Sequence, residues 1–178
     1  MERIKLKDKE FELSIPENKI QSAIKQIADQ MHKDLAEESM PLFLGILNGA
    51  FMFLSDLFKE ISIDCEVSFV KLASYQGTNS TGDVKQLIGL NENLSGRNVI
   101  IVEDIVDTGL TINKLIKQVK SYDPKTLRVA TLLFKPEACQ EKVNLDYVGM
   151  RIPNEFIVGY GLDYDGLGRN FKDIYKAV

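Results

Sequence analysis

Residues 99–111 read VIIVEDIVDTGLT, and they join an apolar run to three acidic side chains and a Thr-Gly-Leu-Thr turn. A continuous apolar run such as Val99 to Val102 is typical of a parallel strand that is covered on both faces. After the turn, apolar residues follow the spacing of an amphipathic helix; they are Ile112, Leu115, Ile116 and Val119. The segment therefore predicts a strand, a polar loop and a helix, in that order.

The loop of this segment has the residue types of a site for a phosphorylated ribose. A helix start offers unpaired N–H groups and the positive end of the helix dipole, and both attract phosphate. Gly109 permits close backbone approach, and Thr108 and Thr111 add hydroxyl groups. Carboxylates repel phosphate, but they bind Mg2+ and accept hydrogen bonds from ribose hydroxyls. The alternative is a surface turn whose acids only cap the helix, but a cap needs one acid and not three.

Strands and helices alternate on both sides of this segment. Strands are expected at residues 42–47, 63–75, 84–90, 127–134, 146–150, 156–160 and 173–177, and helices at residues 17–38 and 50–58. Alternation at residues 63–69 places Ile63, Cys65, Val67 and Phe69 on one buried face, whereas residues 75–83 lack periodicity and predict a flexible loop. The order predicts an α/β fold with a mostly parallel central sheet flanked by helices, which binds ligands at the carboxyl ends of its strands.

Composition excludes several classes of protein. The chain has 178 residues, a size that suits one domain, and a net charge of −4 without a basic run, so nucleic acid is not expected as a partner. No apolar run resembles a signal peptide or reaches the ~20 residues of a membrane span, and we expect a cytoplasmic protein. One histidine (His32) and two distant cysteines (Cys65 and Cys139) argue against a zinc site or a Ser-His-Asp hydrolase.

The segment VIIVEDIVDTGLT resembles the phosphoribosyl-pyrophosphate signature of the type I phosphoribosyltransferase family. Four other segments resemble parts of the same family in the same order, and they are LNGAFMF (47–53, the pyrophosphate loop), ASYQGTNSTG (73–82, the mobile loop), LLFKPEA (132–138, the purine-contacting lysine strand) and EFIVGYGLDYDGLGRNF (155–171, the base-binding hood of hypoxanthine phosphoribosyltransferases). One residue departs from the pattern: Asn48 occupies the position where the family usually has Lys or Arg.

This resemblance implies a fold and an activity. The expected fold is the type I phosphoribosyltransferase fold in one domain, residues 1–178, with a small hood formed by the N-terminal segment and residues 150–178. The expected reaction is Mg2+-dependent transfer of the 5-phosphoribosyl group from phosphoribosyl pyrophosphate to N9 of hypoxanthine, and of guanine, in purine salvage. The family resemblance also implies a homodimer or a homotetramer.

The resemblance also assigns roles residue by residue. Asp107 is the expected acid/base at purine N7. The remaining roles are ribose and 5′-phosphate binding by Glu103, Asp104, Asp107, Thr108, Gly109, Leu110 and Thr111; pyrophosphate binding by Asn48, Gly49, Ser74, Tyr75 and Arg169; purine binding by Lys135, Phe156, Ile157 and Asp163; and metal binding by Glu103, Asp104 and Asp163.

Two alternatives stay open at this point. A non-catalytic nucleotide-binding regulator would keep the phosphate loop but could lose the base-side groups, all of which are present here. An enzyme for another base, such as adenine, xanthine or a pyrimidine, is the second alternative. Lys135 argues against adenine, because an ammonium group cannot accept a hydrogen bond from a 6-amino group, whereas the residues do not exclude xanthine or fix the preference between hypoxanthine and guanine.

Overall fold

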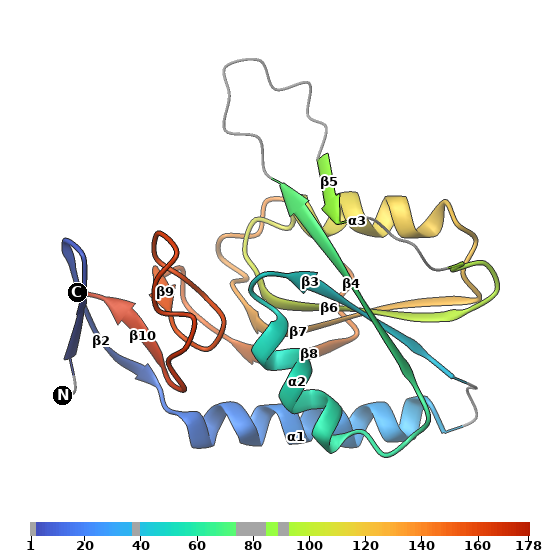
Figure 1. Cartoon of the computed structure of the whole chain (residues 1–178), viewed down its shortest axis with the longest axis horizontal. Coiled ribbons are helices and arrows are strands. Elements are labelled where there is room, and N and C mark those ends of the chain that lie inside the picture. The colour runs from blue at the N-terminus through green and yellow to red at the C-terminus, as the bar shows by residue number, and fades with distance from the viewer. Residues whose placement is uncertain (1–2, 37–39, 74–84, 89–92) are drawn as a thin grey trace.

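The computed structural model describes residues 3–36, 40–73, 85–88 and 93–178, which form two sheets and three helices (Figure 1). The larger sheet has the strand order β5-β4-β3-β6-β7-β8. Its strands are β3 (Leu42–Leu47), β4 (Glu66–Ala73), β5 (Lys85–Ile88), β6 (Asn98–Val106), β7 (Thr126–Phe134) and β8 (Tyr147–Arg151). All neighbours pair in parallel except β4 and β5, so the predicted mostly parallel α/β sheet is confirmed.

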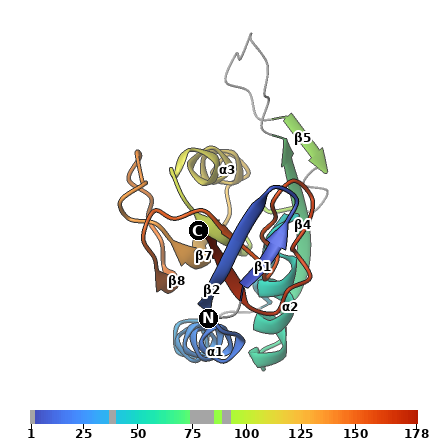
Figure 2. The ribbon, with the colours of Figure 1, turned by 90° about the vertical axis from the view of Figure 1, so that its left-hand side faces the viewer.

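Helices cover both faces of the larger sheet. The helices α1 (Glu17–Asp34) and α2 (Phe51–Glu60) lie on one face, and α3 (Leu110–Lys120) lies on the other (Figure 2). Alternate residues of β6 follow this division, because Ile100 and Val102 pack into the core under α1 and α2 whereas Val99 and Ile101 pack under α3. A strand with two buried faces needs apolar residues at every position, which is why the run Val99 to Val102 has no alternation.

Several element boundaries differ from the prediction. The first helix ends at Asp34, not at residue 38, although its C-cap residue Leu35 is still buried; residues 37–39 lie outside the described residues. The strand predicted at 99–102 extends to Val106, so two of the acids belong to it. The strand predicted at 156–160 contains only Ile157 and Val158, because residues 159–161 adopt positive φ angles. The expected loop at 75–83 lies outside the described residues.

The predicted buried face of residues 63–69 is confirmed only in its first half: Ile63 and Cys65 are half-buried against the core under α1 and α2, whereas Val67 and Phe69 are exposed. The strand begins only at Glu66, and the side chains of Val67 and Phe69 are 46% and 36% exposed, whereas Val70 is fully buried. The helix α2 packs over β3 and β6, so the outer strand β4 is left partly uncovered. Alternation alone could not reveal which strand would lie outside the helix.

The smaller sheet is antiparallel and brings the two chain ends together. Its strand order is β1-β2-β10-β9, with β1 (Arg3–Leu6), β2 (Lys9–Ile15), β9 (Ile157–Val158) and β10 (Ile174–Ala177). Phe11, Val158 and Tyr175 form its own apolar core. The predicted strands include none before residue 17, although the alternating charged and apolar residues of this segment have the period of a half-exposed strand. No helix of the described residues is long and apolar enough to cross a membrane.

Candidate active site

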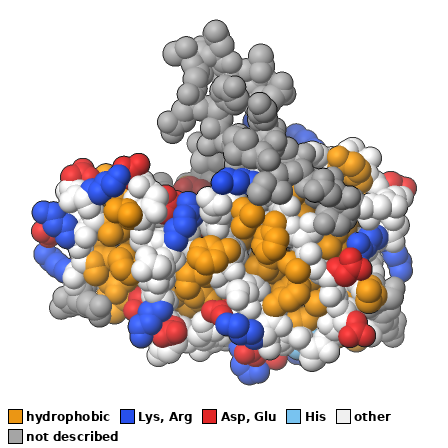
Figure 3. All heavy atoms as spheres, in the orientation of Figure 1, with side chains coloured by type: hydrophobic (Ala, Val, Ile, Leu, Met, Phe, Trp, Pro, Cys, Tyr) orange, Lys and Arg blue, Asp and Glu red, His pale blue; other side chains and the backbone are white. Residues whose placement is uncertain are grey.

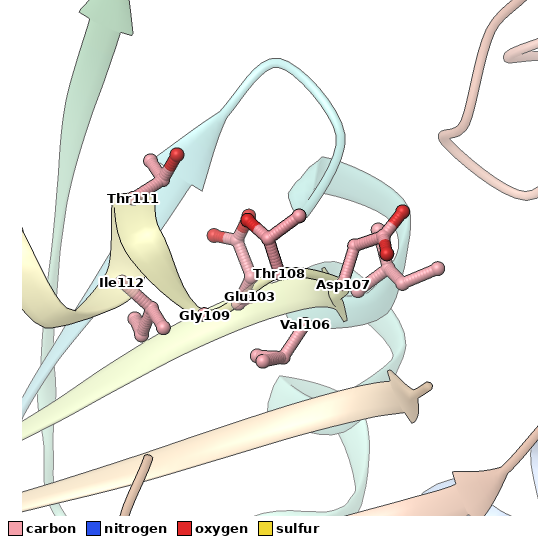
Figure 4. A pocket seen from close by; sticks show the side chains of 8 residues that line it. Glu103, Val106, Asp107, Thr108, Gly109, Thr111 and Ile112 are labelled. Atoms are coloured by element: carbon pink, nitrogen blue, oxygen red, sulfur yellow. The ribbon is translucent and has the colours of Figure 1, made fainter. Parts of the chain in front are cut away.

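The loop between β6 and α3 forms a cavity of about 130 Å3. Eight residues line it, namely Glu103, Ile105, Val106, Asp107, Thr108, Gly109, Thr111 and Ile112. Thr111 and Asp107 stand at opposite ends of the loop, with Glu103 and Thr108 between them (Figure 4). Since α3 begins at Leu110, the first N–H groups of the helix border the cavity, which gives it the character of an anion site.

Gly109 is required at the start of α3 for two reasons. Its φ angle is +83°, in the left-handed region that favours glycine. A Cβ atom there would also lie 2.7 Å from Cγ2 of Val143 and 2.8 Å from the carbonyl oxygen of Glu141. The loop conformation therefore depends on a segment about thirty residues further along the chain.

This segment, residues 138–143, is a part of the site that sequence reasoning missed. The N–H of Gln140 donates to the carbonyl oxygen of Thr108 at 3.0 Å, and the amide nitrogen Nδ2 of Asn113 donates to Oε2 of Glu141 at 3.0 Å. These contacts hold both ends of the phosphate loop. They join residues far apart in the chain and carry no local pattern, so no motif could indicate them.

The two acids at the end of β6 are buried carboxyl groups. Asp104 is 8% exposed, and burial raises its pKa to about 6 even though three hydrogen bonds and the charge of Arg169 act in the opposite direction. Burial, followed by the neighbouring Asp104, raises the pKa of Glu103 well above its ordinary value. Among the described residues, no group hydrogen-bonds to the buried atom Oε2 of Glu103. The charge of Arg169 and the hydrogen bonds to Asp104 therefore do not offset the cost of burying two neighbouring carboxylates.

The loop between β3 and α2 lies directly against these acids. Its residues Asn48 and Gly49 follow a cis peptide bond between Leu47 and Asn48. A Cβ atom on Gly49 would lie 1.7 Å from Oδ2 of Asp104, and a Cβ atom on Gly161 would lie 2.1 Å from the carbonyl oxygen of Gly49. Only glycine permits both approaches, so this loop joins the acid pair to the segment that follows β9.

Lys135 and Asp107 meet at the carboxyl ends of two neighbouring strands. In the register of β6 and β7, Val106 lies opposite Phe134, and the next residues of both strands are therefore adjacent. The Nζ atom of Lys135 lies 3.2 Å from Oδ2 of Asp107. Lys135 is 6% exposed, whereas the Asp107 side chain is 47% exposed, so the carboxylate borders both the cavity and solvent.

Arg169 and Asp163 form an ion pair beside the β3–α2 loop. The Nη2 atom of Arg169 lies 2.5 Å from Oδ1 of Asp163, and its Nη1 atom donates to the carbonyl oxygen of Gly161 at 2.6 Å. The other carboxylate oxygen of Asp163 accepts from the N–H of Gly166 at 2.7 Å. No three acidic, histidine or cysteine side chains of the described residues gather into a metal site, so Asp163 does not join Glu103 and Asp104.

Phe156 and Ile157 lie at the edge of the smaller sheet. The Phe156 ring is 48% exposed and packs against Phe11 and, edge-on, against Tyr164. The carbonyl oxygen of Phe156 accepts from the N–H of Ala177, and Val158 pairs with Tyr175 on the same side. Because successive residues of a strand point their backbone groups to opposite sides, those of Ile157 point to the open edge of the sheet.

The structure thus brings most of the predicted site residues to the carboxyl edge of the larger sheet. They fall into an acid and phosphate group around Glu103 to Thr111, a base-side pair of Asp107 and Lys135, and a loop group of Gly49, Gly161 and Arg169. Phe156 belongs to a separate aromatic cluster on the smaller sheet. Ser74 and Tyr75 lie outside the described residues.

Comparisons with known proteins agree on one family. The family model of the phosphoribosyl transferase domain matches residues 16–165. A hypoxanthine-guanine phosphoribosyltransferase of Streptococcus pyogenes is 44% identical over 155 residues, which are 86% of each chain. A hypoxanthine phosphoribosyltransferase of Escherichia coli (strain K12) is 38% identical over 169 residues, which cover 94% of this chain and 95% of the relative.

A solved structure agrees with these relatives. The crystal structure of a hypoxanthine-guanine phosphoribosyltransferase from Bacillus anthracis superposes on this chain with a TM-score of 0.88 at 39% identity, and the match covers 94% of this chain and 98% of the other. Because the family model spans most of the sequence, and because these relatives match over nearly their whole length, this chain belongs to the phosphoribosyltransferase family and is similar to its hypoxanthine and hypoxanthine-guanine members.

Proposed function

We propose that this protein transfers the 5-phosphoribosyl group from phosphoribosyl pyrophosphate to N9 of hypoxanthine and guanine, which gives inosine or guanosine monophosphate and pyrophosphate in purine salvage. The observation that carries this proposal is the pair of Asp107 and Lys135, whose charged atoms lie 3.2 Å apart at the rim of the anion cavity. A 6-oxopurine offers an acceptor at O6 and a nitrogen at N7 on one edge, and these groups match a lysine beside a carboxylate.

The phosphoribosyl group is expected to occupy the β6–α3 loop. The N–H groups at the start of α3 and the hydroxyls of Thr108 and Thr111 bind the 5′-phosphate there. Glu103 and Asp104 are aimed at the ribose hydroxyls, which can donate to the buried carboxylate oxygens. This arrangement explains why two acids lie next to an anion site, since they bind a different part of the same ligand.

Base recognition uses the other side of the loop. Lys135 donates to O6, and Asp107 shares the proton at N7 as the purine bonds to C1′ through N9, the role of a general acid/base. The exposed ring of Phe156 offers a face for stacking. The outward-pointing N–H and carbonyl groups of Ile157 read the purine edge through the backbone, so the identity of its side chain is of little consequence to the base.

The acid pair fits Mg2+. A carboxylate oxygen of Glu103 is buried without a hydrogen-bond partner among the described residues, and the pKa values of both acids are raised, which is what two carboxylates without a cation should show. Mg2+ is commonly held by one or two carboxylates together with substrate phosphates, so Glu103 and Asp104 suffice and Asp163 would serve a second ion. When bound, Mg2+ neutralises the charge that grows on the leaving pyrophosphate.

The leaving group is assigned to the loop group. Asn48 and Gly49 present backbone N–H groups, and Arg169 supplies the positive charge whose fork matches phosphate oxygens. Arg169 already binds Asp163 and the Gly161 carbonyl, so it is held in place before the substrate arrives. Ser74 and Tyr75, which lie outside the described residues, belong to this proposal as further pyrophosphate-binding residues.

A homodimer or homotetramer is also part of this proposal. Hydrophobic side chains gather on the face of the molecule that β4 and the start of α2 form (Figure 3). Phe51 is the first residue of α2, Val67 and Phe69 belong to β4, and the exposed fractions of these three residues lie between 36% and 46%. Exposed apolar side chains that gather on one face favour association with another protein surface, and a second copy of the chain would cover them.

The test is a comparison of kcat/KM for hypoxanthine, guanine, xanthine and adenine with phosphoribosyl pyrophosphate and Mg2+. The proposal predicts that hypoxanthine and guanine are used far better than adenine. Preference for adenine would contradict the role of Lys135. Binding of phosphoribosyl pyrophosphate without turnover of any base would instead identify a regulator built on this fold.

A further inference from the structure

We propose that Tyr160 and Asp56 are positioning residues for the pyrophosphate side of this site, an inference that rests on the proposed function. The hydroxyl of Tyr160 donates to Oδ2 of Asp56 at 2.5 Å. Asp56 belongs to α2, which begins two residues after Gly49, whereas Tyr160 belongs to the segment that follows β9. The bond therefore ties together the two segments that provide the Asn48–Gly49 loop and Arg169.

Tyr160 is held in a conformation that residues other than glycine rarely adopt. Its φ angle is +50°, between Gly159 at +108° and Gly161 at +95°, and its side chain is 2% exposed. Left-handed backbone costs free energy at a residue with a Cβ atom, so the side chain must contribute interactions that keep it there. The hydrogen bond to Asp56 and burial in the core under α1 and α2 are such interactions.

Gly161, the residue after Tyr160, contacts both Gly49 and Arg169 of the loop group. Gly161 lies so close to Gly49 that a Cβ atom would come within 2.1 Å of the Gly49 carbonyl oxygen. The carbonyl oxygen of Gly161 accepts from Arg169 at 2.6 Å, and the N–H of Gly161 donates to the carbonyl oxygen of Arg169 at 3.0 Å. A displacement of Tyr160 would move both the loop and the arginine, but not Lys135, which directly follows β7.

Other hydrogen bonds fix the Asp56 carboxylate in the position where it accepts from Tyr160. Gln21 from α1 donates to the same oxygen, Oδ2, at 2.8 Å, and Lys59 donates to Oδ1 at 2.7 Å. Burial alone would raise the pKa of Asp56, but the hydrogen bonds from Lys59, Tyr160 and Gln21 outweigh burial and hold the pKa below its ordinary value. The carboxylate thus stays ionised and accepts from two helices and from the tyrosine at once.

Three substitutions separate positioning from general stability. Tyr160→Phe removes only the hydroxyl, and Asp56→Ala removes its acceptor. Asp56→Asn is the conservative arm, because an amide oxygen in the place of Oδ2 still accepts from Tyr160 and Gln21 while the amide nitrogen faces the exposed Lys59. Tyr164→Phe is the matched control, since it also removes a Tyr–Asp hydrogen bond, with Asp8, but on the exposed side of the smaller sheet.

The measurements are the KM for phosphoribosyl pyrophosphate, the inhibition constant of pyrophosphate and the KM for hypoxanthine. We expect Tyr160→Phe and Asp56→Ala to raise the first two constants by about three- to tenfold, the worth of part of one hydrogen bond to a charged group. The KM for hypoxanthine should stay within about twofold. Asp56→Asn and Tyr164→Phe should resemble the wild type, and the variant with both Tyr160→Phe and Asp56→Ala should lose no more than the worse single variant.

Three outcomes would overturn the inference. Unchanged constants in Tyr160→Phe, with a fall in melting temperature alone, would show that the bond only stabilises the fold. An equal rise in both KM values, or losses that add in the double variant, would show that the two residues do not act as one unit. If Asp56→Ala does not fold, Tyr160→Phe and Asp56→Asn decide the question by themselves. A wild-type protein without phosphoribosyl transfer would instead refute the proposed function.

Discussion

Lys135 is buried, and its charge is balanced by Asp107, which is partly exposed to solvent. An ammonium group that is 6% exposed needs a partner charge, and Asp107 supplies it at 3.2 Å. The carboxylate keeps 47% of its side-chain surface exposed, so it can turn towards a ligand. A bound 6-oxopurine would insert its acceptor next to the lysine and its N7 next to the aspartate, so that both charges keep a partner.

Replacing Asp107 by asparagine should separate binding from chemistry. The amide keeps the shape of the side chain and can still bond to Lys135, but it cannot exchange a proton with N7. We predict a loss of about 10²–10⁴-fold in kcat, with an unchanged dissociation constant for phosphoribosyl pyrophosphate. Steady-state assays measure kcat, and a direct binding experiment measures the dissociation constant of phosphoribosyl pyrophosphate. Turnover close to that of the wild type would show that Asp107 is not the catalytic acid/base.

Replacing Lys135 by alanine should affect the base and not the sugar phosphate. Lys135 directly follows β7 and contacts Asp107, but it is not among the residues that line the anion cavity. We predict that hypoxanthine binding weakens by about 1.5–3 kcal/mol, the value of a hydrogen bond to a charged group, while phosphoribosyl pyrophosphate binds as before. Lys120→Ala, on the exposed end of α3, is the control. Equal losses for both substrates would show that Lys135 does not contact the base.

The buried acid pair should destabilise the protein at neutral pH when Mg2+ is absent. The pKa of Asp104 is about 6 in the folded protein and 3.8 as the reference value, so folding favours the protonated form. The protonated Asp104 therefore contributes to the free energy of unfolding. This contribution is fully present below the reference pKa and is lost as the pH rises through about 6. We predict that Asp104→Asn, which does not titrate, is about 2–3 kcal/mol more stable than the wild type above pH 7.

Thermal unfolding at pH 4.5 and 7.5 in a chelating buffer measures this difference. The advantage of Asp104→Asn should be large at the higher pH and should shrink at the lower one. Asp29→Asn, on the exposed surface of α1, should show no such change. A difference that does not depend on pH would mean that the environment of Asp104 does not raise its pKa.

At the scale of elements, the proposed function gives the β3–α2 loop a role in pyrophosphate binding without a charged side chain. Gly49 lies against Asp104 and Gly161 at distances that exclude any Cβ atom, and the loop therefore offers backbone groups in fixed positions. Asn48 beside it is exposed. A cation at this position is usual in the family, so the loop of this chain should bind pyrophosphate with one attraction fewer.

Asn48→Lys should therefore tighten pyrophosphate binding, by no more than about 1–2 kcal/mol because the position is exposed to solvent. Added salt should reduce the gain, as it does for any screened charge. Product inhibition by pyrophosphate at low and high ionic strength measures the effect, and Asn18→Lys on α1 makes the same change of charge away from the site. Identical inhibition constants for Asn48→Lys and the wild type would show that residue 48 does not lie next to the bound pyrophosphate.

The elements also show what a sequence can and cannot reveal. The strand and helix around residues 99–111 were predictable because a fully buried strand and an amphipathic helix each leave a pattern in consecutive residues. The exposure of Val67 and Phe69 was not, because it depends on the length of α2 and on the strands that it covers. The same holds for the contacts of Gln140, Glu141 and Val143 with the phosphate loop, which only the folded chain brings together.

At the scale of the whole molecule, the proposed function divides the site between the two sheets. The larger sheet carries the anion cavity, the acid pair and Lys135 at its carboxyl edge. The smaller sheet, built from both ends of the chain, carries Phe156 and the outward-pointing backbone of Ile157. The segment from Gly159 to Arg169 joins the two, since it reaches Gly49 at one end of the larger sheet and Phe171 beside the smaller one.

This division predicts that some substitutions weaken only the binding of phosphoribosyl pyrophosphate and others only the binding of the base. Turnover requires that both substrates bind. The most direct measurement is the formation of inosine monophosphate from hypoxanthine, phosphoribosyl pyrophosphate and Mg2+, followed together with the release of pyrophosphate. We predict equal amounts of the two products with the wild type and a nearly complete loss of both with Asp107→Asn. Pyrophosphate released without the nucleotide, or no reaction with any 6-oxopurine, would contradict phosphoribosyl transfer to purines.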